Sequence, residues 1–463
     1  MTQSFRNPSG SAARWWHEAR ATVALAAPLA LTQLAYIAIL ATDTLMMAWL
    51  GPDALAAGVL AGHLYLFVGF FAFGVLFAIG PLLAQQLGAR RYRRIRPTVR
   101  QGFWAAMALS LPCLAAFWHA APILTALGQD PHLAAASQSY LRFMAAGFLP
   151  SLWGLVLSEF LAAHLRPRPT LVVVVVGIAV NAAADYAFMF GHFGLPDMGL
   201  DGAGVASAIV NVVMFAALLT YVLADRRLRR YRLFGGFWRI DWARLMEIIR
   251  VGIPIAVADI AEIGMFLGAA LLMGLIGTAT LAAYAIASQC AAIVYTVPLG
   301  LAQAATVRVG RAAGAGKHAG VARAGWAAMA VGSGLALVPA AGLIVLGGAI
   351  ASLFVDPTLP QNKATFELAV VFLALVGLFH LADAFQVIAL GALRGLKDTR
   401  GPMLIALAGY GLIGLPSAAL FGVTLGFGGE AIYVSLMTAV TAVGLLLARR
   451  FRERTRGSGR RAT

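Results

Sequence analysis

The chain has 463 residues, of which 61% are hydrophobic and 12% are charged, and its mean hydropathy is +0.83. Soluble domains are about 45–50% apolar and about 25% charged, so this composition excludes a water-soluble fold, a disordered chain and a nucleic-acid-binding domain. A membrane-spanning helix needs about 20 apolar residues in sequence, whereas membrane β-barrels alternate apolar and polar residues. The sequence therefore predicts an all-α polytopic membrane protein.

Apolar runs between charged residues and Pro or Gly predict twelve transmembrane helices. In chain order they cover residues 21–48, 54–84, 101–125, 135–163, 169–192, 202–224, 246–275, 280–307, 324–354, 366–392, 402–424 and 428–448. A basic segment divides these helices into two groups of six. The predicted parts are an N-terminal segment (1–20), an N-lobe (21–224), a basic inter-lobe loop (225–245), a C-lobe (246–448) and a basic tail (449–463).

The net charge of +16 comes from cations that gather on one side of the predicted helices. All 35 Lys and Arg residues except Arg142 and Lys363 fall in the ends and connections on that side. Because positive loops stay in the cytoplasm, both termini and the basic loop are expected to be cytoplasmic. The charge thus predicts the orientation of the helices in the membrane and gives no sign of a nucleic-acid partner. The polar segment 1–20 is not expected to be a cleavable signal.

The two halves resemble one another at a constant offset of 226 residues. The matching pairs are Pro28 and Pro254, Leu50-Gly51 and Ile276-Gly277, Gly74 and Gly300, and Gly88-Ala89 and Gly314-Ala315. Six-helix repeats of equal orientation are typical of secondary transporters, whose binding site lies near the membrane midplane.

Acidic residues inside the predicted helices are candidates for function, because a charge in mid-membrane is costly. They are Asp43, Glu159, Asp185, Asp259, Glu262 and Asp383. No Lys or Arg is expected deep in a helix to pair with them. Unpaired buried carboxylates take up a proton or hold a cation, and either behaviour would couple transport to an ion gradient.

The first and seventh predicted helices carry the acids with the clearest context. Asp43 lies between two threonines in the first helix, which favours a functional role. Asp259 and Glu262 are three residues apart on one face of the seventh helix, just beyond Pro254, and could share a proton. Asp259 lies nearer the cytoplasmic end, and a structural role is equally open for it.

The remaining acids leave a structural role open. Asp383 follows His380 by three residues, so the two could relay protons, although a lone membrane histidine is more often a structural hydrogen-bonding residue. Asp185 lies one turn after Asn181, and this polar stripe suits a site and structural hydrogen bonding equally. Glu159 is expected at the cytoplasmic interface.

No pattern of an enzyme or a cofactor site occurs. Cys113 and Cys290 are isolated in apolar runs, which indicates buried thiols and neither a disulfide nor a metal site. The sequence contains no GxxxxGK[ST] or GxSxG motif, and its histidines lack metal-ligand spacing. We therefore expect neither ATP-driven transport by this chain, nor an enzyme, nor a cofactor other than a coupling ion.

Short motifs in a fixed order resemble the multidrug and toxic compound extrusion (MATE) transporters over about residues 20–450. The motifs are Pro28 to Gln33, Thr42-Asp43-Thr44, Ala84-Gln85, Gly194 to Pro196, Gly202 to Ala206, Pro254 with Glu262 and Phe266, Pro298 to Gly300, Val307 to Gly310, Asp383 to Val387, Gly391 to Gly395 and Lys397 to Arg400. Each motif is weak alone, but their order and spacing together are specific.

The resemblance implies an antiporter that expels cationic or amphiphilic compounds in exchange for H⁺ or Na⁺. It implies two six-helix lobes that form a central cleft and alternate access, in a monomer surrounded by membrane lipids. The ion-coupling or substrate-binding residues would be Asp43, Glu262 and Asp383, with Asp185, Asn181, Asp259 and Gln33 as further candidates. A Na⁺ ion would lie at Glu262 and Asp383.

Two features depart from the family pattern. Many members have Ala-Ala-His-Gln where this chain has Ala282-Ala283-Tyr284-Ala285, so a polar pair is lost. Asp259 stands where an uncharged residue is commoner. The sequence therefore does not choose between the N-lobe and the C-lobe acids as the coupling site.

Two other functions are alternatives. A lipid-linked saccharide flippase of the same superfamily would have more arginines in its cavity, whereas the interior candidates here are acids. A membrane-embedded transferase would need clustered His/Asp or DxxD motifs at the interface, and the sequence has none.

Overall fold

The computed structural model describes residues 11–460, and these residues form helices without any strand. The α-helices are α1 (Ser11–Leu50), α2 (Pro52–Leu76), α3 (Ile79–Gly88), α4 (Ile95–Trp118), α5 (Ala120–Ala126), α6 (Pro131–Ala145), α7 (Phe148–Ala163), α8 (Arg168–Met189), α9 (Leu200–Ala224), α10 (Trp242–Ile276), α11 (Thr278–Gly314), α12 (His318–Val345), α13 (Gly347–Ser352), α14 (Lys363–Gly395), α15 (Arg400–Ala406), α16 (Leu415–Ala418) and α17 (Gly428–Arg460). Short 3₁₀ turns are η1 (Tyr92–Arg94), η2 (His192–Gly194), η3 (Arg229–Tyr231) and η4 (Pro360–Asn362), and two π-helical segments are η5 (Leu407–Gly414) and η6 (Ala419–Thr424).

Within the described residues, eleven helical stretches are long and apolar enough to cross a membrane, and the bent pair α6–α7 makes twelve. The predicted all-α polytopic class is thus confirmed. The two helices of the pair meet at 50°. The bend lies at Gly147, where a Cβ would come within 2.6 Å of the Ala208 Cα, so the chain crosses α9 there too closely for a side chain. The predicted helix 324–354 was too long, because α12 ends at Val345 and α13 follows as a separate short helix.

The helix bounds show the internal repeat directly. The stretch Pro52–Gly88 corresponds to Thr278–Gly314, with an offset of 226 at both ends. The ends of α1 and α10, at Leu50 and Ile276, have the same offset. The repeat therefore extends from matched residues to matched helices.

One pair of membrane-spanning stretches that correspond in the two halves differs in length and in helix type. The stretch Arg168–Met189 has 22 residues, whereas its counterpart Arg400–Thr424 has 25 and contains both π-helical segments. π-helical turns are rare and occur often at functional sites. One of them carries Tyr410, whose side chain is 1% exposed.

The described chain forms two compact units. Residues Leu31–Val257 make up the first, here called the N-unit, and the residues up to Ala30 together with those from Ala258 make up the second, the C-unit. Both boundaries fall inside helices, α1 and α10, shortly after Pro28 and Pro254. The division into lobes at 225–245 stays a prediction. Its terminal segments include residues 1–10 and 461–463, which lie outside the described residues.

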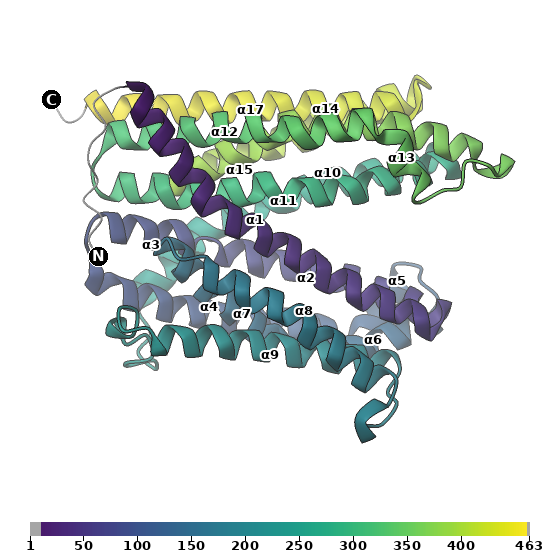
Figure 1. Cartoon of the computed structure of the whole chain (residues 1–463), viewed down its shortest axis with the longest axis horizontal. Helices are drawn as coiled ribbons and strands as arrows, with labels where there is room; N and C mark the ends of the chain where they lie inside the picture. Colours follow the sequence, from purple (N-terminus) through teal and green to yellow (C-terminus); the bar gives the residue numbers. More distant parts are fainter. Residues whose placement is uncertain (1–10, 461–463) are drawn as a thin grey trace. The chain divides into compact units, whose positions relative to one another are not determined.

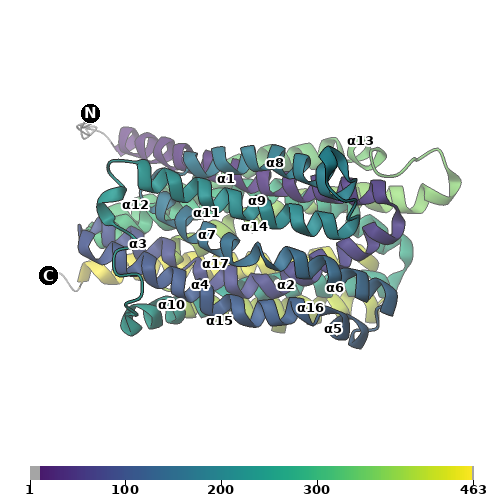
Figure 2. The same cartoon turned by 90° about the horizontal axis from the view of Figure 1, so that it is seen from below.

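In the N-unit, α8 packs along α9, as Figures 1 and 2 show, and α6 and α7 also contact α9. The basic segment after α9 folds back onto α4. Arg100 Nη1 donates a hydrogen bond to the Gly236 carbonyl oxygen (2.8 Å), and Trp104 Nε1 donates one to the Phe237 carbonyl oxygen (2.9 Å). The segment 225–245 is therefore partly fixed to the N-unit by its own backbone.

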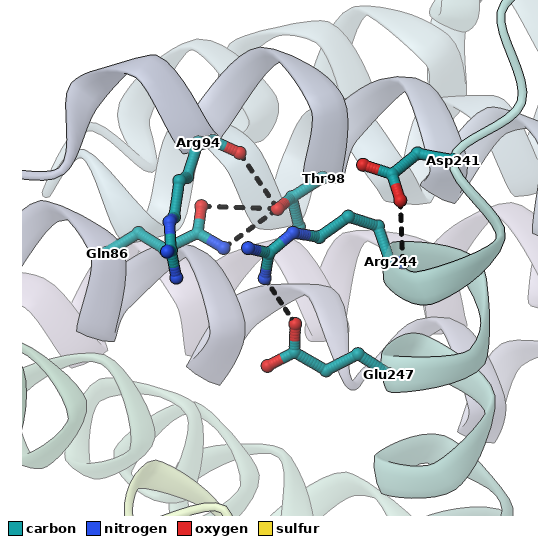
Figure 3. Close-up of polar contacts among 6 residues, drawn as sticks. All are labelled: Gln86, Arg94, Thr98, Asp241, Arg244 and Glu247. Atoms are coloured by element: carbon teal, nitrogen blue, oxygen red, sulfur yellow. Dashed lines mark hydrogen bonds and ion pairs between the residues drawn. The ribbon is translucent and has the colours of Figure 1, made fainter.

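Polar contacts also fix the ends of the neighbouring helices (Figure 3). Gln86 Nε2 donates to Thr98 Oγ1 (2.8 Å), which joins α3 to α4 across the turn between them. Asp241 Oδ1 accepts from the backbone N–H of Arg244 (3.2 Å) and caps the first turn of α10. Arg244 in turn pairs with Glu247 one turn later.

In the C-unit, α14 packs against α11, α12 and α17 (Figure 1). It comes close to α11 at Gly391, where a Cβ would lie 2.4 Å from the Ala302 carbonyl oxygen. Thr306 Oγ1 donates a hydrogen bond to the Gly391 carbonyl oxygen (2.8 Å) and fixes this crossing. The glycine of the motif Gly391 to Gly395 is thus required for helix packing.

An acidic side chain joins the α14–α15 turn to α17. Asp398 accepts from Arg450 Nε (2.8 Å), Arg450 Nη2 (2.9 Å) and Arg454 Nε (2.7 Å). Burial alone would raise the pKa of Asp398, but the hydrogen bonds from Arg450 and Arg454 outweigh it and hold this pKa below its usual range. A lowered pKa means that the stabilisation is present above the pKa of the unfolded chain and is lost as the pH falls through the folded-state pKa.

The variant Asp398→Asn is expected to lower stability at neutral pH by about 1–2 kcal/mol, because it removes a charge-assisted pair that is still partly solvated. The thermal unfolding midpoint of the purified protein should fall at pH 7, and the difference from the unmodified chain should shrink toward pH 3. A difference that stays constant with pH would show that the carboxylate charge of Asp398 does not stabilise this turn.

Candidate functional site

The N-unit brings together four polar side chains from three helices. Asn181 Nδ2, on α8, donates to Asp43 Oδ1 on α1 (2.8 Å) and to Asp185 Oδ2 one turn along α8 (3.1 Å). Ser207 Oγ, on α9, lies 3.5 Å from Asp43 Oδ2. Asp43 is 6% exposed, and Asn181 and Asp185 are fully buried. The predicted stripe of Asn181 and Asp185 therefore faces Asp43 inside the unit.

This cluster, here called the N-cluster (Asp43, Asn181, Asp185 and Ser207), holds two carboxyl groups close together. The carboxyl groups of Asp43 and Asp185 lie within hydrogen-bonding reach of each other. None of the hydrogen bonds or ion pairs that the described side chains make to this cluster comes from Lys or Arg. Two adjacent buried carboxyls cannot both stay charged without a proton or a cation between them, so the N-cluster is suited to take up a positive charge.

Two polar atoms of the N-cluster lack a partner among the described residues. They are Asn181 Oδ1 and Asp185 Oδ1, and both are acceptors when Asp185 is ionised. Buried polar groups in folded proteins are nearly always hydrogen-bonded, so such atoms mark places where a water, an ion or a ligand binds. Oxygen acceptors favour a cation or a hydrogen-bond donor as the bound group.

The C-unit holds a second group of acids, the C-cluster (Glu262, Tyr295, Asp383 and Tyr410). Tyr295 on α11 donates to Glu262 Oε1 on α10 (3.3 Å). Asp383 on α14 is 5% exposed and lies near enough to Glu262 for their charges to interact. Asp383 Oδ1 and Tyr410 Oη, the latter in a π-helical turn, have no hydrogen-bond partner among the described residues. This cluster too has acceptors in place for a cation or a proton.

His380 is buried one turn before Asp383 on α14. No hydrogen bond joins the two side chains in the described structure, and His380 Nε2 has no partner there. The predicted proton relay between them stays a prediction.

Asp259 differs from the other acids because it has a cationic partner. It forms an ion pair with Arg394 at the end of α14. No Lys or Arg was expected deep in a helix to pair with the acids, and Arg394 does not lie deep in one. It reaches Asp259 from the last turn of α14, because this helix continues through Gly395 and so includes Arg394, which the sequence assigned to a loop. Asp259 is neutralised within the protein, whereas Glu262 and Asp383 are not.

The two other candidates lie apart from these contacts. Gln33 is half-buried on α1 and takes no part in the hydrogen bonds of either cluster. Glu159 is half-buried on α7, with its carboxylate against Gly80. Within the described residues, no group of three or more His, Cys, Asp or Glu side chains has an arrangement that could hold a metal ion.

Three residues of the clusters carry no signal in the sequence. All three lie within apolar helices, where a serine usually bonds to the backbone of its own helix and a tyrosine usually packs as an aromatic residue; they are Ser207, Tyr295 and Tyr410. Their roles follow only from which helices pack together. Arg394 could have been assigned to this helix from the sequence, because it lies less than one turn beyond the predicted end of the helix 366–392.

Comparisons with known proteins agree with the fold and with the motifs. The family model MatE matches residues 28–187 and 254–420. A protein named probable multidrug resistance protein NorM, from Mesorhizobium japonicum, is 44% identical over 444 residues, which cover 96% of this chain and 95% of that protein. A protein of the same name from Pseudomonas aeruginosa is 38% identical over 434 residues, covering 93% and 89%.

Solved structures show the same fold. The eukaryotic MATE transporter AtDTX14 is similar with a TM-score of 0.83 at 20% identity, over 97% of this chain and 100% of that one. A variant of the MATE transporter VcmN from Vibrio cholerae is similar with a TM-score of 0.86 at 16% identity, over 96% and 98%. At such identities these likenesses establish the fold and nothing finer.

Proposed function

Because the chain belongs to the MATE family of transporters, we propose that it is a secondary antiporter that exports cationic or amphiphilic drugs in exchange for H⁺ or Na⁺. The observation that carries this proposal is the N-cluster, in which two buried carboxyl groups share an asparagine and have no cationic partner among the described residues. The relatives named multidrug resistance proteins support the class of substrate.

Competition between the coupling ion and the drug for the same negative charge accounts for their exchange. A carboxyl group of Asp43 or Asp185 that holds a proton or Na⁺ cannot also neutralise an organic cation, because both need the same oxygen atoms. Binding of the inward-moving ion therefore weakens binding of the substrate, and the reverse holds by linkage. Alternating access, with release of the drug on one side and of the ion on the other, would convert this competition into antiport.

We place the second set of coupling residues in the C-cluster. Glu262 and Asp383 make no ion pair within the described residues, since the Arg that pairs with an acid of this region contacts Asp259. A Na⁺ ion would take its oxygen ligands from these two carboxylates. The N-cluster and the C-cluster each contain two acids suited to ion coupling, so we propose both clusters as coupling sites.

The proposed location is the prokaryotic inner membrane, with both termini in the cytoplasm. It is supported by the gathering of all Lys and Arg residues except Arg142 and Lys363 on one side of the membrane-spanning helices. Arg142, on the opposite side, is held by Trp118, over whose ring its guanidinium lies at 5.0 Å. We propose a monomer as the working unit.

Ethidium efflux from proteoliposomes under an imposed gradient tests the proposed function. Vesicles that contain the full chain should expel the dye when an inward H⁺ or Na⁺ gradient is applied, and an ionophore that collapses the active gradient should stop efflux. Protein-free vesicles are the control. Efflux that depends on neither gradient would contradict the antiporter and favour the flippase.

A further inference from the structure

A basic pocket lies at the end of the C-unit, away from both acid clusters in the sequence and in the contacts of the structure. It has a volume of about 560 Å³ and is lined by Leu396, Lys397, Asp398, Thr399, Arg400, Arg450 and Arg454. Four of these side chains are cations and one is an acid. From this arrangement we propose that the pocket binds the phosphate headgroup of an anionic phospholipid.

The acid does not cancel the positive charge of the pocket but holds two of its cations in place. Asp398 accepts two N–H groups of Arg450 and one of Arg454, and its carboxylate side chain is 8% exposed. A guanidinium has five N–H donors, so Arg450 keeps others for a second acceptor. Paired guanidinium groups with fixed planes match the oxygen atoms of a phosphate.

The wall of the pocket is shaped for Arg450. A Cβ at Gly401 would lie 2.1 Å from the Arg450 Cζ, so the glycine leaves the space in which the guanidinium lies across the first turn of α15. Arg400, one residue earlier, is exposed and has no hydrogen-bond or ion-pair partner among the described side chains. The pocket therefore combines two positioned cations with one whose charge is not matched by any acid.

The level at which the pocket lies in the membrane favours a lipid headgroup over a soluble anion. The apolar part of α15 begins after Arg400, and the apolar part of α17 ends at Ala448, just before the basic residues of its last turns. The pocket thus lies where both helices leave the hydrocarbon region, which is the level of lipid phosphates. Basic pockets between helices at this level on the cytoplasmic side bind anionic headgroups.

A second hollow, on the other face of α17, lies at the same level of the membrane. Arg452 and Arg456 line a second, smaller hollow of about 350 Å³ together with Trp326. Residues two apart on a helix point to opposite faces, so this hollow lies across α17 from the basic pocket. Tryptophan is enriched at the membrane–water interface, and its presence beside these arginines marks the same level.

The test measures binding of phosphatidylglycerol to the purified full chain in nonionic detergent, by native mass spectrometry with increasing lipid. The double variant Arg400→Gln/Arg454→Gln should raise the apparent dissociation constant about 30-fold, since each cation near a membrane surface contributes about 1 kcal/mol. Arg450 still pairs with Asp398 in this variant. Arg400→Lys/Arg454→Lys keeps both charges but loses the guanidinium planes, so it should bind more weakly than the unmodified chain and more tightly than the Gln double variant.

A charge-matched control is Arg91→Gln/Arg93→Gln, which removes two exposed cations from the N-unit. It should bind phosphatidylglycerol as the unmodified chain does, and phosphatidylcholine should bind equally to all variants. Equal loss in the control and in the pocket variant would overturn the proposal. Competition by inorganic phosphate as effective as that by the lipid would overturn the assignment to a lipid.

If the double variant does not fold, the single variant Arg400→Gln serves, because Arg400 makes no contact on which the described fold depends. It should weaken binding about fivefold, following the same contribution per charge. Unchanged binding in Arg400→Gln would likewise contradict the proposal. The outcome is independent of the antiport mechanism, since neither acid cluster is altered.

Discussion

Asp43→Asn is expected to abolish ion-driven ethidium efflux while the protein still folds and inserts. Asparagine keeps an oxygen that can accept the hydrogen bond from Asn181 Nδ2, so the packing of α1 against α8 should survive. It cannot take up or release a proton, and it carries no charge for Na⁺ or for a cationic drug. The loss should be at least about 100-fold, which corresponds to roughly 3 kcal/mol of lost interaction with the transported cation.

The matched control for Asp43→Asn is Asp53→Asn, which removes an exposed acid of the same unit and should leave efflux unchanged. Glu262→Gln is expected to abolish efflux in the same assay, because it removes an acid of the C-cluster. The measurement is the initial rate of dye efflux per folded protein in proteoliposomes. Dye efflux that persists in Asp43→Asn, Glu262→Gln and Asp383→Asn would show that carboxylates do not couple the ion.

Arg394→Gln is expected to destabilise the C-unit. The substitution leaves Asp259 without its partner in a partly buried position, where Arg394 and Asp259 are 17% and 23% exposed. Removing one member of a fully buried ion pair costs about 3–5 kcal/mol, and the residual exposure here reduces the expected cost to about 2–3 kcal/mol. The thermal unfolding midpoint in detergent should fall clearly.

A double-mutant cycle with Asp259→Asn separates the ion pair from the packing of Arg394. The variant Arg394→Gln/Asp259→Asn should be more stable than Arg394→Gln alone, because no charge is then left unpaired. Arg323→Gln, at an exposed position of the same unit, is the control and should have little effect. If the double variant were no more stable than Arg394→Gln, the pair would not be what holds Arg394 in place.

The sequence was sufficient for the fold class because hydrophobic length alone determines membrane-spanning helices. It was also sufficient for the pairing of Asn181 with Asp185, since residues four apart share a helix face. The bend at Gly147 could not be predicted in this way, because it depends on a close crossing with Ala208 on another helix.

The acid clusters were predicted only in part. Acidic residues in apolar helices can be recognised one by one, and Asp43 and Asp185 do meet in the structure. The partners that distinguish the acids cannot be recognised from the sequence, because Tyr295 and Arg394 lie on other helices, 33 and 135 residues away from the acids they contact. From the sequence Asp259 was a further candidate beside Glu262, but its ion pair with Arg394 could not be predicted.

The π-helical turns in Arg400–Thr424 carry an evolutionary consequence. If the two halves descend from one duplicated ancestor, the three residues by which this stretch exceeds Arg168–Met189 were inserted in this half or deleted from the other. A π turn holds one more residue than an α turn, so it accommodates the difference without breaking the helix and rotates the following side chains around the helix axis. The two copies can thus differ in which residues face the interior while their spans keep the same order, and Tyr410 lies in the stretch where they differ in this way.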